Sequence, residues 1–281
     1  MTGAGPEAAS SRVQIWGIVN VTPDSFSDGG AFFDGDRAIS HGRELRAQGA
    51  TVLDVGGEST RPGATPVGAE EEIRRVLPVI EALAGDGAVV SVDTYRSETA
   101  CVALAAGARI VNDVSGGLAD PEILRTVAAA GATIALGHWR GPSADMYARA
   151  EYADVAREVA AELRERVDAA VSAGIARERI IVDPGIGFAK AGEQNWALLR
   201  RLDHVRALGL PVLVGTSRKR FLATALGDDA TNERRDLATA VTSVLAARQG
   251  AYGVRVHDVR ATRDALAVAA AWDGTVEEER A

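Results

Sequence analysis

The chain has 281 residues with 31 Lys or Arg and 39 Asp or Glu, a formal net charge of −8 that argues against a nucleic-acid-binding or polybasic membrane-surface protein. The single cysteine, Cys101, excludes an internal disulfide framework and a multi-cysteine metal site. No apolar run approaches the roughly 20 residues of a membrane span, and no signal peptide is visible. We therefore expect a cytoplasmic protein without nucleic-acid or membrane partners.

Short β-branched runs alternate along the chain with longer stretches of helical composition. Strands are predicted at 13–19, 51–55, 88–92, 109–112, 133–136, 179–182, 211–214 and 252–256. Helices are predicted at 36–48, 69–84, 97–106, 121–130, 153–173, 193–207 (with a break), 233–249 and 258–272. Asp120-Pro121 and Asp258 are typical helix starts. Glycines expected just after helix ends are Gly49, Gly107, Gly131 and Gly174.

Eight strand–helix units in about 260 residues indicate an α/β fold, a single-domain (β/α)8 TIM barrel. The alternative is an open, doubly wound parallel sheet with helices on both faces. Even spacing of the units favours the closed barrel. The domain is expected at 12–272, between a flexible N-terminus at 1–11 and an acidic, flexible tail at 273–281.

Polar residues stand at or just after the end of each predicted strand. They are Asn20, Asp54 and Glu58, Asp93, Asn112 and Asp113, His138, Asp183, the Ser217-Arg218-Lys219 run, and Arg255 with His257. In a βα barrel all these ends meet at the face that carries the active site. Helix capping would explain one or two such positions, but it does not easily explain the whole set.

The last predicted strand indicates an anion site. Side chains alternate along a strand, so Arg255 and His257 share one face, just before a helix N-terminus. Arginine is suited to bidentate binding of phosphate. The alternative is a buried Arg255 that pairs with Asp54 or Asp93.

A glycine-rich turn after the sixth strand indicates a ligand that approaches the backbone closely. Asp183 begins this turn, and its carboxylate could accept two parallel N–H bonds from a flat amino-heterocycle, a role that Asp93 could share. Either carboxylate could instead cap a helix. Only two of the basic residues are lysines: Lys190 is expected at the surface, and Lys219, beside Ser217, is expected to contact a ligand. Residue spacing thus predicts a barrel enzyme for an anionic, phosphorylated small molecule, and leaves a divalent metal open.

Seven motifs, in order along the chain, resemble dihydropteroate synthase. They are GIVNVTPDSFSDGG (17–30), DVGGESTRPGA (54–64), SVDTYR (91–96), VNDVSGG (111–117), VDPGIGFAK (182–190), GTSRKRF (215–221) and VRVHDV (254–259). The resemblance implies a transferase of a group other than methyl, acting in tetrahydrofolate biosynthesis. It would join p-aminobenzoate to 6-hydroxymethyl-7,8-dihydropterin diphosphate and release pyrophosphate, with sulfonamides competing for the p-aminobenzoate site.

The resemblance also implies a role for each matched residue. Asn20 would be a ligand of the cofactor Mg²⁺. Pterin diphosphate would be bound by Thr60, Asp93, Asn112, Asp183, Lys219, Arg255 and His257, of which Asp93, Asp183, Lys219, Arg255 and His257 would be catalytic. The p-aminobenzoate would lie beside Thr60, Arg61, Phe188 and Ser217, and a mobile loop would carry Asp24, Phe26 and Asp28. The family is typically a homodimer.

The implied mechanism is departure of diphosphate, assisted by Mg²⁺, followed by capture of the pterin cation by the arylamine. Two positions depart from the family pattern. Gly137 stands where the family usually has a methionine that packs on the pterin, so glycine is expected to leave room or to alter this contact. Arg220 stands where many members have serine, so one p-aminobenzoate contact is expected to differ.

Two other functions remain open at this level. A pterin-dependent methyltransferase would share the barrel and the carboxylate–pterin contacts, but it would not need the Ser-Arg-Lys loop. A non-catalytic pterin-binding paralogue would lack turnover that depends on magnesium.

Overall fold

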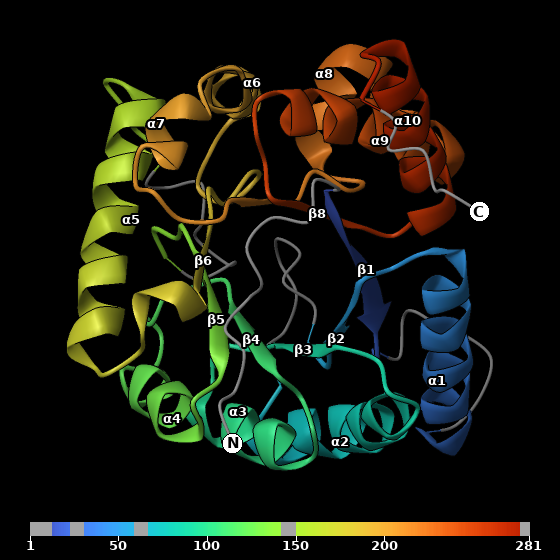
Figure 1. Ribbon diagram of the computed structural model, residues 1–281, viewed down its shortest axis with the longest axis vertical. Helices are drawn as coiled ribbons and strands as arrows, with labels where there is room; N and C mark the ends of the chain where they lie inside the picture. The colour runs from blue at the N-terminus through green and yellow to red at the C-terminus, as the bar shows by residue number, and fades with distance from the viewer. Residues whose placement is uncertain (1–12, 23–30, 59–66, 142–149, 276–281) are drawn as a thin grey trace.

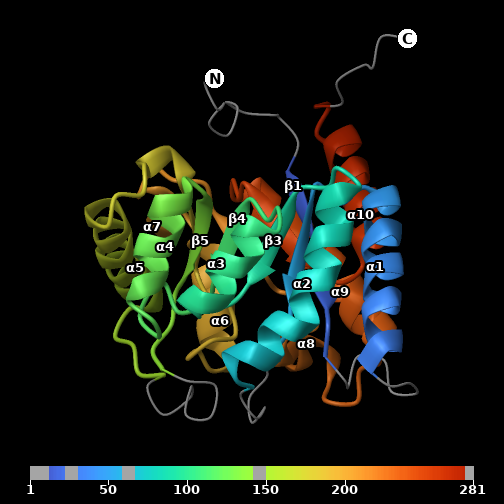
Figure 2. The same cartoon turned by 90° about the horizontal axis from the view of Figure 1, so that it is seen from below.

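The structure, a computed structural model, describes residues 13–22, 31–58, 67–141 and 150–275, with side chains in the first helix described from residue 35. Eight parallel strands lie at the centre and helices surround them (Figure 1). The strands are β1 (Gln14–Asn20), β2 (Val52–Gly56), β3 (Val90–Asp93), β4 (Ile110–Asp113), β5 (Thr133–Gly137), β6 (Ile180–Asp183), β7 (Leu213–Val214) and β8 (Gly253–Val256). Seen from the side, the helices pack along the outside of the strands (Figure 2).

The sheet closes almost completely on itself. The strand order is β6-β5-β4-β3-β2-β1-β8-β7. Its two ends meet where Val182 bridges to Val212 and the Val182 amide donates to the Pro211 carbonyl at 2.9 Å. The predicted (β/α)8 barrel is therefore confirmed, and the open doubly wound alternative is wrong.

The helices follow the predicted order. They are α1 (Ala31–Gln48), α2 (Ala69–Gly85), α3 (Ser97–Ala105), α4 (Glu122–Ala130), α5 (Val155–Ser172), α6 (Gly192–Arg200), α7 (Asp203–Arg206), α8 (Ala223–Leu226), α9 (Asn232–Arg248) and α10 (Val259–Trp272), with 3-10 turns η2 (Arg177–Arg179) and η3 (Arg220–Leu222). The break predicted within 193–207 separates α6 from α7. The helix predicted from residue 36 begins earlier, at Ala31, and α8 and both 3-10 turns were not predicted.

The predicted helix ends have the expected chemistry. The Asp258 side chain accepts from the amide of Ala261 at the start of α10. Asp120 accepts from the Glu122 amide at 3.1 Å and from the Ser97 amide at 2.8 Å, so one carboxylate caps both α3 and α4. All four predicted C-terminal glycines have positive φ.

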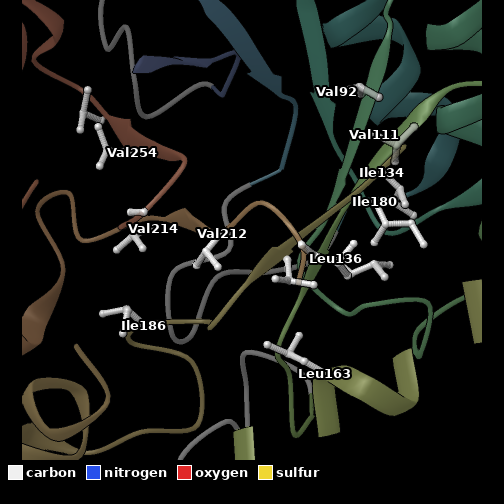
Figure 3. Close-up of a cluster of buried hydrophobic side chains, with 14 of the residues drawn as sticks. Val92, Val111, Ile134, Leu136, Leu163, Ile180, Ile186, Val212, Val214 and Val254 are labelled. Carbon is white, nitrogen blue, oxygen red and sulfur yellow. The ribbon is translucent and has the colours of Figure 1, made fainter. Parts of the chain in front are cut away.

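Alternation along the strands divides the apolar side chains into two layers. The outward side chains pack against the helices, and Figure 3 shows part of this layer, including Leu136 of β5 and Leu163 of α5. The inward side chains form a smaller cluster inside the barrel, made of Trp16, Val52, Ile110, Ala135, Ile181 and Leu213. Farther along the strands the inward positions become polar, so the barrel has an apolar floor and a polar mouth.

The termini expected to be flexible fall almost wholly outside the described residues. Residues 1–11 lie beyond them, as does the tail after residue 275. Within the described ranges, no helix combines the length and apolar character needed to cross a bilayer.

Candidate active site

A pocket opens at the carboxyl ends of the strands, where the sequence predicted the site. Its volume is about 460 Å³, part of it open to solvent. Its lining residues are Asn112, Val114, Gly137, Asp183, Gly185, Phe188, Gly215, Lys219 and Arg255. The lining thus combines ionisable side chains with glycine residues, whose backbone is directly accessible from the pocket.

Arg255 joins two carboxylates within the barrel mouth. Its Nε donates to Asp54 Oδ2 at 2.5 Å and its Nη2 to Asp93 Oδ2 at 2.6 Å. Asp54 is fully buried and also accepts from Asn112 Nδ2 at 3.0 Å. Arg255 is therefore paired with both Asp54 and Asp93, the two partners that the alternative interpretation of Arg255 had named. Asp54, which the sequence predicted as a polar strand-end residue and as that alternative partner, fixes two pocket residues at once.

Burial governs the charge state of Asp93. Loss of water raises its pKa to about 7, an effect that Arg255 opposes and that Asp54 reinforces. Asp93 therefore changes its protonation near neutral pH, in direct contact with the guanidinium of Arg255.

Asp183 and Lys219 face each other across the pocket. Asp183 Oδ1 accepts from the Gly185 amide at 2.7 Å, and burial raises the pKa of this carboxyl while Lys219 opposes the rise. Burial lowers the pKa of Lys219 to about 8. A Cβ atom on Gly215 would lie 3.8 Å from Lys219 Nζ and 3.9 Å from Asp183 Oδ2, so glycine leaves this space to a ligand.

Such a pocket suits a flat, polar ring that offers both donors and acceptors. Asp183 supplies an acceptor, Lys219 a compact cation, and Asn112 an amide, and all three line the pocket at the carboxyl ends of the strands. A wider groove between α5 and α6 offers less, because its Arg201 is already paired with Asp154 at 2.8 Å.

Comparison with known proteins decides the family. The family model of pterin binding enzymes matches residues 16–257. A dihydropteroate synthase of Mycobacterium leprae is 52% identical over 265 residues, which cover 92% of this chain and 93% of that protein. The chain belongs to the dihydropteroate synthase family. It is thus an enzyme that transfers a group other than methyl.

Solved dihydropteroate synthases have the same fold. One from Xanthomonas albilineans, solved with 4-aminobenzoic acid, has a TM-score of 0.87 and 46% identity over 93% of each chain. One from Yersinia pestis, solved as a sulfonamide drug complex, has a TM-score of 0.89 and 38% identity over 98% of this chain and 99% of that chain.

The structure brings together much of the dihydropteroate synthase site predicted from the motifs. Asn112, Asp183, Phe188, Lys219 and Arg255 line one pocket, and Asp93 contacts Arg255. Ser217 and His257 form a pair beside the pocket: Ser217 Oγ lies 2.8 Å from His257 Nδ1 and accepts from the His257 amide at 3.1 Å. Outside the described residues lie Asp24, Phe26, Asp28, Thr60 and Arg61.

Asn20 and Arg220 are not among the residues that line the pocket. Asn20 is half-buried at the end of β1, beside Gly56 of β2. Arg220 is exposed at the start of η3. Within the described ranges, no three His, Cys, Asp or Glu side chains gather as potential metal ligands.

Gly137, where the dihydropteroate synthase family usually has methionine, does not leave a vacant space. A Cβ atom there would lie 2.6 Å from the carbonyl oxygen of Val114 and 2.7 Å from its Cα. Asp113 fixes this approach by accepting from the Ser115 amide at 2.8 Å and the Gly117 amide at 2.6 Å. The Val114 backbone therefore occupies the position that a side chain would take, and the altered contact with the pterin stays a prediction.

Lys190 was expected at the surface, and that prediction is wrong. The side chain is 1% exposed, among the largest that are fully buried. Its Nζ lies 2.9 Å from Nδ1 of His138, a residue 52 positions away in the chain. No local pattern reveals this contact, since the pairing exists only once β5 and β6 lie side by side.

Proposed function

We propose that this pocket binds the pterin ring and catalyses the synthesis of 7,8-dihydropteroate. The substrates would be 6-hydroxymethyl-7,8-dihydropterin diphosphate and p-aminobenzoate, and the other product pyrophosphate, in a step of tetrahydrofolate biosynthesis. The observation that carries the proposal is the pocket in which Asp183, Asn112 and Lys219 converge around the space left by Gly215. The relative solved with 4-aminobenzoic acid supports the choice of the second substrate.

Ring recognition follows from the hydrogen-bonding inventory of these side chains. The two oxygens of the Asp183 carboxylate accept from the ring amino group and the adjacent N–H, Oδ1 beside its bond from the Gly185 amide, while Lys219 donates to the ring carbonyl. Asn112, held by Asp54, reads a further ring nitrogen. Arg255 stacks on the ring, because its guanidinium is planar and is fixed at two carboxylates.

The proposed reaction needs no protein nucleophile. The bond between the pterin methylene carbon and the diphosphate oxygen breaks, and its electron pair leaves with the diphosphate. The arylamine nitrogen then attacks the methylene cation and loses a proton to solvent. Among the described residues, the lone cysteine is exposed on α3 and does not line the pocket, which fits this route.

The residues present fit a magnesium ion that is held mainly by the substrate. Asn20 offers one neutral oxygen at the end of β1, and no cluster of acidic side chains competes for the ion within the described ranges. Mg²⁺ accepts such a set when phosphate oxygens and water complete its shell. When bound, it would stabilise the negative charge on the departing diphosphate. His257, oriented by Ser217, would donate to the same group.

The second substrate is proposed to lie beside Phe188 and Ser217, with Thr60 and Arg61 completing its site. Sulfonamides would compete there, as the sulfonamide complex of the Yersinia pestis relative suggests. Asp24, Phe26 and Asp28 would belong to a loop that closes over the bound substrates and excludes water, which would otherwise trap the cation as the alcohol.

Pyrophosphate release from purified protein tests the proposal. The assay is run with and without p-aminobenzoate and Mg²⁺, and the product is identified as dihydropteroate. Asp183→Asn, which keeps the shape and the contact with Gly185 but removes the charged acceptor, should lower kcat/KM by about ten- to a hundredfold. Pterin binding without any dihydropteroate formation would contradict the proposal and favour a non-catalytic pterin-binding protein.

We also propose a homodimer, joined through α9 and α10. Leu237, Val241 and Leu245 recur at every fourth residue of α9 and are all exposed, so they form one apolar stripe. Val268 and Trp272 are exposed on the neighbouring α10, the latter at 84%. Apolar patches of this kind mark interaction surfaces, and a second copy of the chain is the proposed partner. A cytoplasmic location is proposed as well, supported by the unpaired Cys101.

A further inference from the structure

Lys190 ties the loop after β6 together from the inside. Its buried Nζ donates to the carbonyl oxygen of Gly185 at 3.0 Å and to that of Phe188 at 2.9 Å. Both acceptors belong to the loop that leads from Asp183 to Lys190 itself. The ammonium group therefore takes the place of the water that would solvate these carbonyls in an exposed loop.

The backbone of this loop needs such support. Gly185, Gly187 and Ala189 all have positive φ, at 65°, 81° and 49°. For alanine this conformation is unfavourable, and such a residue persists only when its surroundings hold it. Asn195 helps by accepting from the Gly187 amide at 2.6 Å and donating to the Lys190 carbonyl at 3.0 Å.

Burial lowers the pKa of Lys190, yet Nζ faces three acceptors, the two carbonyls and Nδ1 of His138, and only the ammonium form has three protons to donate. Burial, and then the charge of Lys190, lower the pKa of His138 to about 4, so the imidazole is neutral at physiological pH. Its Nδ1 then accepts from Lys190 at 2.9 Å, and its Nε2 carries the proton that is donated to Glu162 at 3.0 Å. The loop is thereby fixed to the end of β5 and, through Glu162, to α5.

The same loop presents two groups to the pocket. The carbonyl of Ile186 accepts from Lys219 Nζ. The ring of Phe188 lies 4.7 Å from that nitrogen, close enough for a cation–π contact. A displacement of the loop would therefore move Lys219 and Phe188 together.

We propose that Lys190 is a positioning residue for the transfer reaction: by holding the Gly185 and Phe188 carbonyls against His138, it fixes Lys219 and the Phe188 ring in the pocket. The proposal rests on the proposed function in assigning these two groups to the substrates. It does not place Lys190 in contact with either substrate.

The test is Lys190→Met, which keeps the length of the side chain and removes all three donors. We expect kcat/KM for both substrates to fall at least about tenfold, since misplacement of a binding group by about 1 Å has effects of this order or larger. The matched control is Arg177→Met, which also removes a cation that donates to a backbone carbonyl, here that of Leu208, but just before β6 begins. The control should keep the kinetics of the wild type.

The pH profile separates positioning from a general loss of structure. The charged groups that face Lys219 are Asp183, Arg255 and Asp93, and burial is the largest cause of its lowered pKa. Loss of Lys190 releases the loop whose Ile186 carbonyl accepts from Lys219 and admits water around Lys219, which lessens this burial. The alkaline limb of kcat/KM should then move upward from about pH 8, whereas a purely structural role would lower the amplitude and leave the limb in place.

A second variant covers the case in which Lys190→Met does not fold. His138→Phe keeps a ring in place and deletes Nδ1, so it should change the kinetics and the alkaline limb in the same direction. If either folded variant has the pH profile and kcat/KM of the wild type, the positioning role is overturned. If the wild-type protein itself forms no dihydropteroate, the proposed function fails instead, and the two failures are distinguishable.

Discussion

Replacement of Asp54 by asparagine isolates the charge of the carboxylate beneath the pocket. Asparagine has nearly the same shape, and Oδ1 of Asp54 has no partner among the described residues, so an amide there displaces no other bond. The loss of negative charge weakens the bonds to the other oxygen, Oδ2, which accepts from Arg255 Nε at 2.5 Å and from Asn112 Nδ2 at 3.0 Å.

The expected loss of stability follows from the burial of Asp54 and from the Arg255–Asp93 pair that remains. Removal of one partner from a buried ion pair costs about 3–5 kcal/mol, because the other charge is left uncompensated. Arg255 keeps its contact with Asp93, so we expect the lower end, about 3 kcal/mol. For a domain of this size, 1 kcal/mol shifts the melting temperature by about 2–4 °C, so Asp54→Asn should lower it by roughly 6–12 °C.

Two assays check this reasoning, thermal unfolding and steady-state kinetics. Asn112 and Arg255 share Asp54 as their anchor, so kcat/KM should fall by about ten- to a hundredfold along with stability. Asp86→Asn is the control, since Asp86 pairs with Arg43 at the surface and its loss should leave both measurements unchanged. An unchanged melting temperature for Asp54→Asn would refute the claim that the buried pair stabilises the fold. A normal kcat/KM in a destabilised variant would refute the anchoring role.

Three further predictions test the pocket, its titration and the surface. Gly137→Ala should destabilise the protein by about 1–3 kcal/mol in urea unfolding, because its Cβ would lie 2.6 Å from a backbone atom. The control Gly35→Ala, with open space around it in α1, should stabilise the protein by up to about 1 kcal/mol. Equal effects of the two substitutions would contradict the close approach at Gly137. In pH–rate profiles, kcat/KM should rise through about pH 7 as Asp93 ionises and fall through about pH 8 as Lys219 loses its proton. A flat profile from pH 6 to 9 would argue against both roles. Val241→Glu should convert the proposed dimer to a monomer in light scattering, and a monomeric wild type would contradict the dimer.

Local sequence patterns were sufficient for the barrel and for the direction of its functional side chains. Strict alternation along β8 predicted that Arg255 and His257 share one face, and the structure shows Arg255 inside the barrel with Val254 and Val256 in the outer apolar layer. Asp93 and Asp183 were predictable for the same reason, since each ends a strand whose carboxyl end meets the others at one rim.

Each residue that sequence reasoning misjudged has a contact with a distant segment. Lys190 looked like a surface residue because lysine usually is one, and only the approach of His138 and two loop carbonyls makes its burial favourable. Gly137 looked like a missing side chain, whereas the neighbouring turn at Val114 uses the space. A signal for Asp54 was present, because alternation sets it two residues beyond the inward Val52, but its second partner, Asn112, could not be predicted.

Because the sequence holds only two lysines, the pocket can be labelled selectively through Lys219. The sequence holds two lysines, and one of them, Lys190, is sealed from solvent. Lys219 is partly exposed at the pocket, and a pKa of about 8 keeps much of it as the free, nucleophilic amine in mildly alkaline buffer. An amine-reactive reagent would therefore modify this protein at its N-terminal amine and at Lys219 almost alone. Mass spectrometry of that second adduct would report, without any radioactive or coupled assay, whether the pocket is filled.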